Sequence, residues 1–350
     1  MAKIKDISLL LGLLLLNGCA PPLQKYTDTI LGPFDTVTTF IAYAQDEETF
    51  NSYRDAVFST LEEMHVLFDI YNEYDGVNNL YTINKQAGIE PVVVDAEIIT
   101  LLEHGIESHR LTEGAFNIAL GSVLQIWHDH RTYGIAHPED ATVPERAVLT
   151  EANHHTDINK LVIDKVKHTV YLEDKDMSLD VGAIGKGYAA ELAMARAKAL
   201  GMENGLISAG GHIVAVGKPA EENRDAWHVA IQDPTRSQLF QMGAIDTISA
   251  SDVSVSMSGP YQRYFEVDGV IFGHLIHPQT LMPSVLYDQV VIIHPSSWMT
   301  DILSTALFNL SIEEGKLLAQ EVGAQVLWID TQGHWTYTDG YKEGSNVLNQ

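Results

Sequence analysis

Asp301 and Thr305 lie four residues apart in the stretch "TDILSTALF", a spacing that places both on one face of an α-helix. Ser296 or Ser297 can cap the start of this helix. A carboxylate and a hydroxyl side by side offer the hard oxygen ligands that Mg²⁺ or Ca²⁺ prefers. The alternative is that Asp301 only follows the preference of carboxylates for the first turn of a helix. Two side chains are too few for a metal site, so a phosphate and a backbone carbonyl or water must complete it.

The segment "SLDVGAIGKGYAAE", residues 178–191, places three glycines and Lys186 at the start of an alanine-rich run. Glycines let the backbone approach a ligand closely, and a helix N-terminus favours anions. Lys186 can reach a phosphate or pair with Asp180. Val181 and Gly187 stand where a P-loop requires glycine and Ser or Thr, so a P-loop nucleotide hydrolase is not expected. A surface lysine at a glycine-rich helix start remains the alternative.

Two further stretches carry weaker signals. Gly210 and Gly211 interrupt the apolar strand "LISAGGHIVAVG", which indicates either a bulge or a ligand pressed against the backbone. His274 and His277 are three apart on an expected strand, so they face opposite sides and do not form an obvious metal pair. One of these two histidines is a candidate acid or base.

Four other histidines occur in pairs, His128 with His130 and His154 with His155. Zinc motifs such as HExxH or a cysteine cluster are absent, so we expect solvated loop histidines. The polar, proline-containing residues 129–147 are expected to form a surface excursion.

The elements that must position these residues follow from the hydrophobic pattern. Periodic apolar residues predict helices, and paired β-branched runs with turn dipeptides such as Asp268-Gly269 predict hairpins. Hairpins imply antiparallel sheets, so we expect an α+β fold with helices packed on those sheets rather than βαβ units. The expected strands and hairpins are residues 34–44, 160–173, 261–277 and 324–338, and the expected helices are 53–71 and 97–111.

The composition bounds the class of protein. The 350 residues are 45% hydrophobic, enough for one large domain or two closely packed ones. The formal net charge of −26 argues against a nucleic-acid partner, which needs a basic surface. Cys19 is the one cysteine, so no intrachain disulfide forms and the core must supply the stability.

The N-terminus has the pattern of a secretory segment. Lys3 and Lys5 precede the apolar run 7–16, which is too short to span a bilayer, and no later run is long enough. The run ends in "LNGC", the lipobox of bacterial lipoproteins apart from an unusual Asn17, which predicts lipid on Cys19. The alternative is an ordinary secretory signal with an accidental cysteine. The expected division is a signal peptide over 1–18, a lipidated tether over 19–30 and a folded domain over 31–345, on the extracytoplasmic face of a bacterial membrane.

Several blocks in this order resemble the ApbE family, the FAD:protein FMN transferases. The resemblance covers about residues 31 to 310 and rests on "IYNEYDGVNNLYTINKQAG", "TEGAFNIALGSVLQIW", "SLDVGAIGKGYAAE", "ISAGGHIVAVG", "SGPYQRYFEVDG", "HLIHPQT" and "TDILSTALF". It implies an ApbE-like (T-fold-like) α+β architecture with FAD in a cleft and Mg²⁺ at the pyrophosphate. It also implies transfer of FMN to a Ser or Thr of an acceptor protein, such as an electron-transport subunit of the cell envelope.

The resemblance also assigns residues by position. Asp301 and Thr305 match the metal-binding side chains, and Ala183 matches the residue whose main-chain oxygen joins them. Three departures are His277 for an aspartate, Leu281 for a glycine, and Asn117 for an aspartate. Positions that match the FAD pocket or its rim are Tyr74, Asp180, Lys186, Gly210, Gly211, Ser258, Arg263, His274 and Thr280.

The implied reaction is attack by the acceptor hydroxyl on the FMN-side phosphorus of FAD, with AMP leaving. His274 is the candidate to help deprotonate the hydroxyl or orient the phosphate. Two alternatives stay open at this point. Water in place of the hydroxyl gives an FAD pyrophosphatase that releases FMN and AMP, and a lipoprotein without catalysis only binds and stores flavin.

Overall fold

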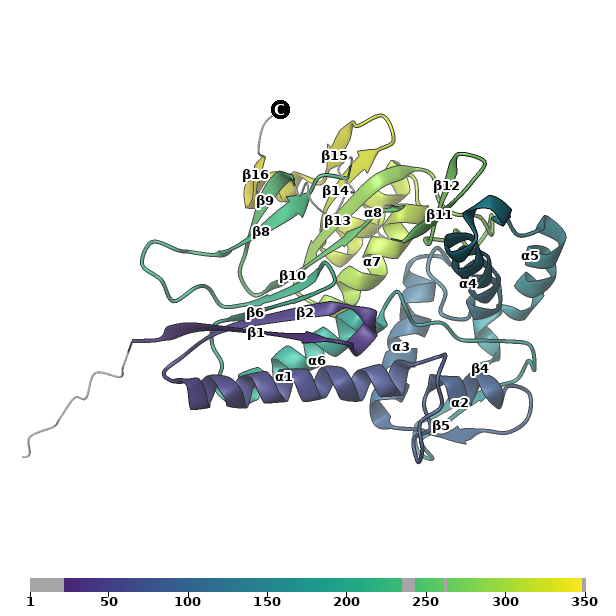
Figure 1. Cartoon of the computed structure of the whole chain (residues 1–350), viewed down its shortest axis with the longest axis horizontal. Helices are drawn as coiled ribbons and strands as arrows, with labels where there is room; N and C mark the ends of the chain where they lie inside the picture. Colours follow the sequence, from purple (N-terminus) through teal and green to yellow (C-terminus); the bar gives the residue numbers. More distant parts are fainter. Residues whose placement is uncertain (1–21, 235–242, 261–262, 348–350) are drawn as a thin grey trace, which may run out of the picture.

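An eight-stranded antiparallel sheet forms the centre of the molecule in the computed structural model, which describes residues 22–234, 243–260 and 263–347 (Figure 1). This arrangement confirms the expected α+β class with antiparallel sheets. In spatial order the strands are β1 (Gln24–Leu31), β2 (Val37–Ala44), β6 (Gly205–Ala209), β7 (His212–Val216), β10 (Val253–Ser258), β13 (Tyr287–His294), β14 (Gln325–Asp330) and β15 (Trp335–Tyr337).

Three smaller sheets and a set of helices surround the central sheet. The smaller sheets contain β11 (Tyr264–Val267) with β12 (Val270–Gly273); β16 (Ser345–Val347), β9 (Ala244–Ala250) and β8 (Trp227–Gln232); and β3 (Val92–Val93), β5 (Thr169–Leu172) and β4 (Leu161–Asp164). The helices are α1 (Glu47–Phe68), α2 (Leu80–Lys85), α3 (Ala96–Leu111), α4 (Gly121–Ala136), α5 (Arg146–Ala152), α6 (Gly185–Ala199), α7 (Ser297–Asn309), α8 (Ile312–Val322) and α9 (Asp339–Gly344).

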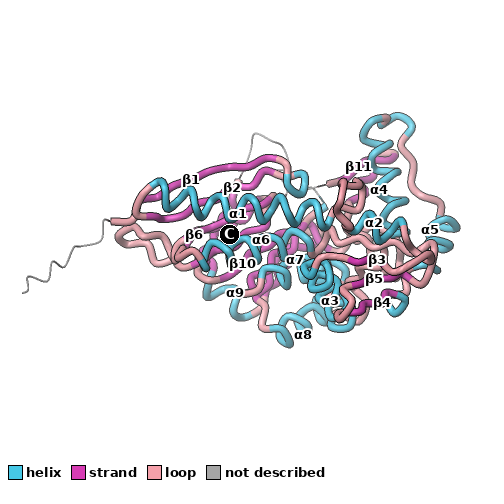
Figure 2. The backbone as a smooth tube through the Cα atoms, turned by 90° about the horizontal axis from the view of Figure 1, so that it is seen from below, coloured by secondary structure: helices cyan, strands magenta, loops and turns pink. Residues whose placement is uncertain are grey.

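Helices α1, α6 and α7 cover one face of the central sheet (Figure 2). The periodic residues Val57, Leu61 and Met64 of α1 are fully buried there, as their spacing predicts. The helix begins earlier than expected because the Asp46 carboxylate accepts a hydrogen bond from the Thr49 N–H (2.8 Å) and caps it.

The opposite face of the central sheet is covered by β8, β9 and β16. Ile231 and Ile248 of this small sheet pack with Ile213 and Val291 of the central sheet in a second core. Strand β7 is therefore buried along its whole length and shows no alternation of polar and apolar residues.

The hairpins expected over 160–173 and 324–338 are present as β4–β5 and β14–β15. In the hairpin expected over 261–277, β11 and β12 are joined by Asp268 and Gly269, both at positive φ as a two-residue turn requires. The strand expected over 34–44 begins only at Val37, since Phe34 lies in a short 3₁₀ turn with positive φ.

The described N-terminal residues differ from the expected tether. Residues 24–31 form β1, which pairs along its length with β2, and the Tyr26 ring stacks on Phe50 at 5.2 Å. The folded part therefore starts earlier than residue 31, because this edge strand is held by its neighbour and by α1. Cys19 and the signal segment lie outside the described residues. No helix within the described ranges has the length and apolarity needed to cross a membrane.

The surface excursion expected over 129–147 is wrong in its first half. Residues 129–136 complete α4, which packs through Trp127 against Phe265 and Phe272 of the β11–β12 hairpin in a third core. The polar residues of this segment fall on the outer faces of a helix whose other face is buried, and that obscured the pattern.

Candidate active site

A cavity of about 710 Å³ opens where α4, α6, α7, β10 and the β11–β12 hairpin meet. Ten of the twelve site residues expected within the fold line it, whereas Tyr74 and Thr280 do not. The ten are Asp180, Ala183, Lys186, Gly210, Gly211, Ser258, Arg263, His274, Asp301 and Thr305.

The carboxylate of Asp301 is fixed on one side and open on the other. Its Oδ2 accepts a hydrogen bond from the Gly187 N–H at the start of α6 (2.8 Å), and no described residue donates to its Oδ1. In a regular helix the Gly187 N–H would donate to the carbonyl of Ala183, four residues back. Because Asp301 takes this N–H, no described backbone group donates to the Ala183 carbonyl. Two oxygen atoms are thus left free at one cavity wall.

Thr305 lies one turn after Asp301 on α7 and lines the same cavity, and no described group bonds to its hydroxyl. A carboxylate, a hydroxyl and a backbone carbonyl are ligands that suit a hard divalent cation. The three residues present therefore fit Mg²⁺, although all three occur together only through the packing of α6 on α7.

This packing depends on Gly187. A Cβ atom there would lie 2.6 Å from the Ser297 carbonyl oxygen and 2.7 Å from the Asp301 Cβ. The Ser297 hydroxyl also donates to the Gly187 carbonyl oxygen (2.8 Å). The glycine thus lets the backbone of α6 touch α7, which is the close approach that the glycine-rich segment predicts.

Glu191, one turn further along α6, holds the start of α7. Its Oε2 accepts hydrogen bonds from the Ser296 hydroxyl (2.9 Å) and the Ser297 N–H (2.6 Å). The Ser296 side chain itself does not cap the helix, contrary to expectation. The Glu191 carboxylate of α6 therefore caps the N-terminus of α7 and stabilises the helix that carries Asp301 and Thr305.

We expect Glu191→Ala to lower the free energy of unfolding by about 1 kcal/mol, within the 0.5–2 kcal/mol range of lost helix caps. Urea denaturation followed by circular dichroism measures the change. Glu321→Ala, an exposed glutamate on α8, is the control and should stay near wild type. Equal stability of both variants would show that Glu191 does not cap α7.

His212 lies beside this site at the start of β7 and is 2% exposed. Its Nε2 is 2.7 Å from the Ser297 hydroxyl, and its Nδ1 is 3.9 Å from the Asp301 Oδ1 with no hydrogen-bond partner among the described residues. Burial lowers the pKa of His212 to about 4, so its ring is neutral at physiological pH. It begins β7 because Gly210 and Gly211, both at positive φ, make the two-residue turn from β6, rather than the bulge considered above.

Three cations, Lys186, Arg131 and Arg263, line the cavity of an otherwise strongly acidic chain. Lys186 forms no salt bridge with any described residue, including Asp180, the partner considered above. Burial raises the pKa of Asp180, an effect that Arg131 and Arg263 oppose. The cluster offers a binding surface for phosphates at a helix N-terminus.

His274 follows β12 and faces these cations. Its Nδ1 lies 3.2 Å from the Arg263 carbonyl oxygen, which can only accept, so Nδ1 carries the proton and Nε2 is left with a lone pair. Burial, together with Arg263, Arg131 and Lys186, lowers the pKa of His274 to about 3. The side chain is therefore a neutral acceptor in the free protein.

The aromatic wall of the cavity differs from the expectation for Tyr74. The Tyr74 hydroxyl donates to Asp69 Oδ2 (2.8 Å), and Tyr74 does not line the cavity. Tyr71 lines the cavity instead, with its ring 5.1 Å from that of His128 on α4. The expectation that His128 is a solvated loop residue is thus also wrong.

The remaining expected residues have structural partners. The Ser258 hydroxyl donates to Ser304 (2.9 Å), and Thr280 is exposed, with its carbonyl accepting from Arg146. The His277 Nδ1 accepts from the N–H groups of Gln279 (3.2 Å) and Thr280 (3.4 Å), so it caps a turn as an aspartate would and does not lie on a strand.

Leu281 and Asn117, the other two departures from the family pattern, are accommodated in different ways. Leu281 adopts φ 61°, a conformation that favours glycine, while its buried side chain joins the third core. Asn117 lines the cavity and bonds through its Nδ2 to the Thr156 carbonyl (3.0 Å).

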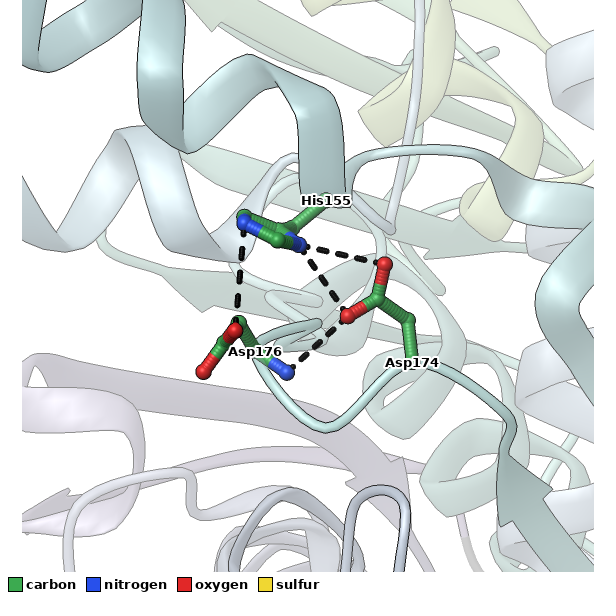
Figure 3. Close-up of side chains that lie close together, drawn as sticks. All are labelled: His155, Asp174 and Asp176. Atoms are coloured by element: carbon green, nitrogen blue, oxygen red, sulfur yellow. Dashed lines mark hydrogen bonds and ion pairs between the residues drawn. The ribbon is translucent and has the colours of Figure 1, made fainter.

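A second cluster, His155 with Asp174 and Asp176, lies outside the cavity lining (Figure 3). His155 Nδ1 is 3.0 Å from Asp174 Oδ1, so the expectation of a solvated histidine is wrong for this residue. Lys160 already pairs with Asp174 Oδ2 at 2.7 Å. The cluster is therefore a local ion-pair network that joins the 3₁₀ turns before β4 to the loop after β5.

Sequence reasoning missed Arg131, Tyr71, His212 and Glu191. Arg131 had a signal in the apolar period of its segment, because α4 continues to Ala136. Tyr71 was expected within the helix 53–71, but α1 ends at Phe68 and Tyr71 follows it. His212 and Glu191 had none, because each acts through a residue about a hundred positions away in the chain.

Comparison with known proteins gives the family. The model of the ApbE family matches residues 34–328. An FAD:protein FMN transferase of Treponema pallidum (strain Nichols) is 35% identical over 286 residues, 78% of this chain and 75% of that protein. The chain belongs to the ApbE family.

Further ApbE proteins match over most of the chain. An FAD:protein FMN transferase of Vibrio cholerae is 28% identical over 342 residues, 95% of this chain and 94% of that protein. The crystal structure of the ApbE protein from Thermotoga maritima has a TM-score of 0.80 and 26% identity, covering 92% of this chain and 99% of that one. The ApbE fold is thus present nearly complete.

Proposed function

We propose that this ApbE protein transfers the FMN moiety of FAD to a Ser or Thr hydroxyl of an acceptor protein and releases AMP, with Mg²⁺ bound at its active site. Its relatives are named FAD:protein FMN transferases, so this protein is a transferase that uses FAD. The observation that carries the proposal is the free oxygen set of Asp301, Thr305 and Ala183 in the same cavity as Lys186 and Arg131.

The residues divide into two groups by chemistry. Asp301 Oδ1, the Thr305 hydroxyl and the Ala183 carbonyl would hold Mg²⁺, which supplies charge stabilisation at the pyrophosphate when bound. Lys186, Arg131 and Arg263 bind phosphate oxygens and orient the FMN-side phosphorus for attack. The cavity's aromatic side, with Tyr71 and Trp127, suits a flat ring system.

The acceptor hydroxyl oxygen forms a bond to the FMN-side phosphorus while the phosphoanhydride bond to AMP breaks. We assign acceptance of the hydroxyl proton to His274 Nε2, whose lone pair is free because Nδ1 donates to the backbone carbonyl oxygen of Arg263. Burial and then the neighbouring cations lower the pKa of His274. The negative phosphates of bound FAD would offset the cations and make Nε2 a better base when substrate is present.

We expect the His274 imidazole of the free protein to stay neutral down to about pH 4, in contrast to an ordinary histidine with a pKa of about 6.5. Because the folded pKa lies below the unfolded one, this group contributes stability above pH 6.5 that is lost as the pH falls toward 3. Histidine ring carbon shifts measured by NMR between pH 3 and 8, with His274→Asn to assign the signal, test this. A midpoint near 6.5 would contradict the low pKa.

One experiment separates the candidate functions. The protein is incubated with FAD, Mg²⁺ and a candidate acceptor domain, and the acceptor is weighed by mass spectrometry. A covalent FMN adduct with free AMP supports the transferase. FMN and AMP without an adduct indicate a pyrophosphatase. Unchanged FAD indicates a flavin-binding protein. Either of these two results refutes the proposal for that acceptor.

The setting of the reaction is also proposed. The lipobox at Cys19 supports lipid attachment at the extracytoplasmic face of a bacterial membrane, which would place the active site near electron-transport subunits of the cell envelope. Cys19→Ala should move the protein from the membrane fraction to the soluble fraction. Unchanged membrane association would argue against the lipid anchor.

A further inference from the structure

We propose that the Nδ1 atom of His212 is a fourth protein ligand of the cation held by Asp301, Thr305 and Ala183. This inference rests on the proposed function, because it concerns the same metal site. It adds a nitrogen to a set of oxygen ligands and thereby changes which metals the site prefers.

The hydrogen bonds of His212 fix which nitrogen carries the proton. The Ser297 hydroxyl donates its one hydrogen to the Gly187 carbonyl oxygen (2.8 Å), so toward His212 it can only accept. At 2.7 Å from that hydroxyl, His212 Nε2 is therefore the N–H donor. The lone pair of the neutral ring is left on Nδ1.

This Nδ1 lone pair has no described partner, although the histidine is buried. A buried polar atom without a partner destabilises the folded protein, so it needs an explanation. Asp301 Oδ1 lies 3.9 Å from His212 Nδ1 and itself lacks a described donor. Two acceptors facing each other call for a cation or a donor between them.

The spacing allows one metal ion to contact both atoms. Ligand bonds to Mg²⁺ or from imidazole to a divalent ion are about 2.1 Å, and twice this length exceeds the 3.9 Å between His212 Nδ1 and Asp301 Oδ1. The surroundings also have the usual form, because a metal-binding histidine donates its other ring N–H to a fixed acceptor, here the Ser297 hydroxyl.

An imidazole ligand shifts metal preference. Carboxylate, carbonyl and hydroxyl oxygens suit Mg²⁺, whereas imidazole suits divalent transition-metal ions. The affinity of a given site for these ions generally increases from Mn²⁺ along the first transition row. The site is thus expected to bind Mn²⁺ and Co²⁺ more tightly, relative to Mg²⁺, than an all-oxygen site would.

Pulsed EPR on the full chain loaded with Mn²⁺ tests the proposal without measuring activity. We expect a coupling from one imidazole nitrogen, changed in pattern when histidine is labelled with ¹⁵N. The coupling should vanish in His212→Asn and persist in His274→Asn and in His228→Asn, an exposed histidine on β8. In titration calorimetry, His212→Asn should lower Mn²⁺ affinity by at least about tenfold and Mg²⁺ affinity by less.

The outcomes distinguish the two proposals. Mn²⁺ binding that is lost in Asp301→Asn but shows no nitrogen coupling in the wild type overturns the role of His212 and leaves the metal site intact. Mn²⁺ binding that does not depend on Asp301 overturns the metal site and this inference together. If His212→Asn does not fold, the ¹⁵N-histidine coupling is compared between the wild type and His274→Asn. A coupling that persists in His274→Asn supports His212 as the ligand, and a coupling that is lost there overturns the assignment.

Discussion

Asp301→Asn is expected to lower the Mg²⁺-dependent turnover of FAD by at least about 10³-fold in kcat/KM, equivalent to about 4 kcal/mol. Asparagine keeps the size of the side chain and an oxygen able to accept the Gly187 N–H, so the packing of α6 on α7 is retained. It removes the negative charge that faces the cation. The loss therefore reports metal binding rather than folding.

Release of AMP from FAD over a range of Mg²⁺ concentrations measures this effect, and circular dichroism verifies the fold. Asp225→Asn is the matched control, since its side chain is 99% exposed and lies outside the cavity lining. If Asp301→Asn turned over FAD at the wild-type rate, the metal assignment would be wrong.

Gly187→Ala has the second largest expected effect, because one methyl group must fit where there is no space. The added Cβ would meet the Ser297 carbonyl oxygen at 2.6 Å and the Asp301 Cβ at 2.7 Å, and both belong to the helix that carries the metal ligands. Helices α6 and α7 must separate, and overpacking of this kind costs about 1–3 kcal/mol. The separation also breaks the Gly187 N–H bond to Asp301, so Mg²⁺ affinity should fall with stability.

Gly185→Ala is the control in the same helix. A Cβ at Gly185 has no neighbour closer than 3.6 Å, so the change should leave the free energy of unfolding unchanged or raise it by less than about 1 kcal/mol. Urea denaturation of both variants measures the difference. Equal stability of Gly187→Ala and wild type would show that the two helices do not pack as closely as described.

The hydrophobic pattern of the sequence predicted the helices and strands that have one apolar and one polar face. Helix α3 and the β4–β5 hairpin occur where expected, because the spacing of apolar residues along the chain determines which face is buried. The pattern was less informative where both faces are covered, as in β7, or where a neighbour decides the boundary, as in β1.

For the site, the sequence alone predicted Asp301 and Thr305 as one turn of a helix, and the glycines that let α6 approach them. The tertiary structure decided which atoms are free: Gly187 donates to Asp301 rather than to Ala183, Tyr71 rather than Tyr74 faces the cavity, and His212 turns an unpartnered nitrogen toward Asp301. Spacing along a helix is a local property, whereas the partner of a hydrogen bond depends on segments a hundred residues apart that meet only when the chain has folded.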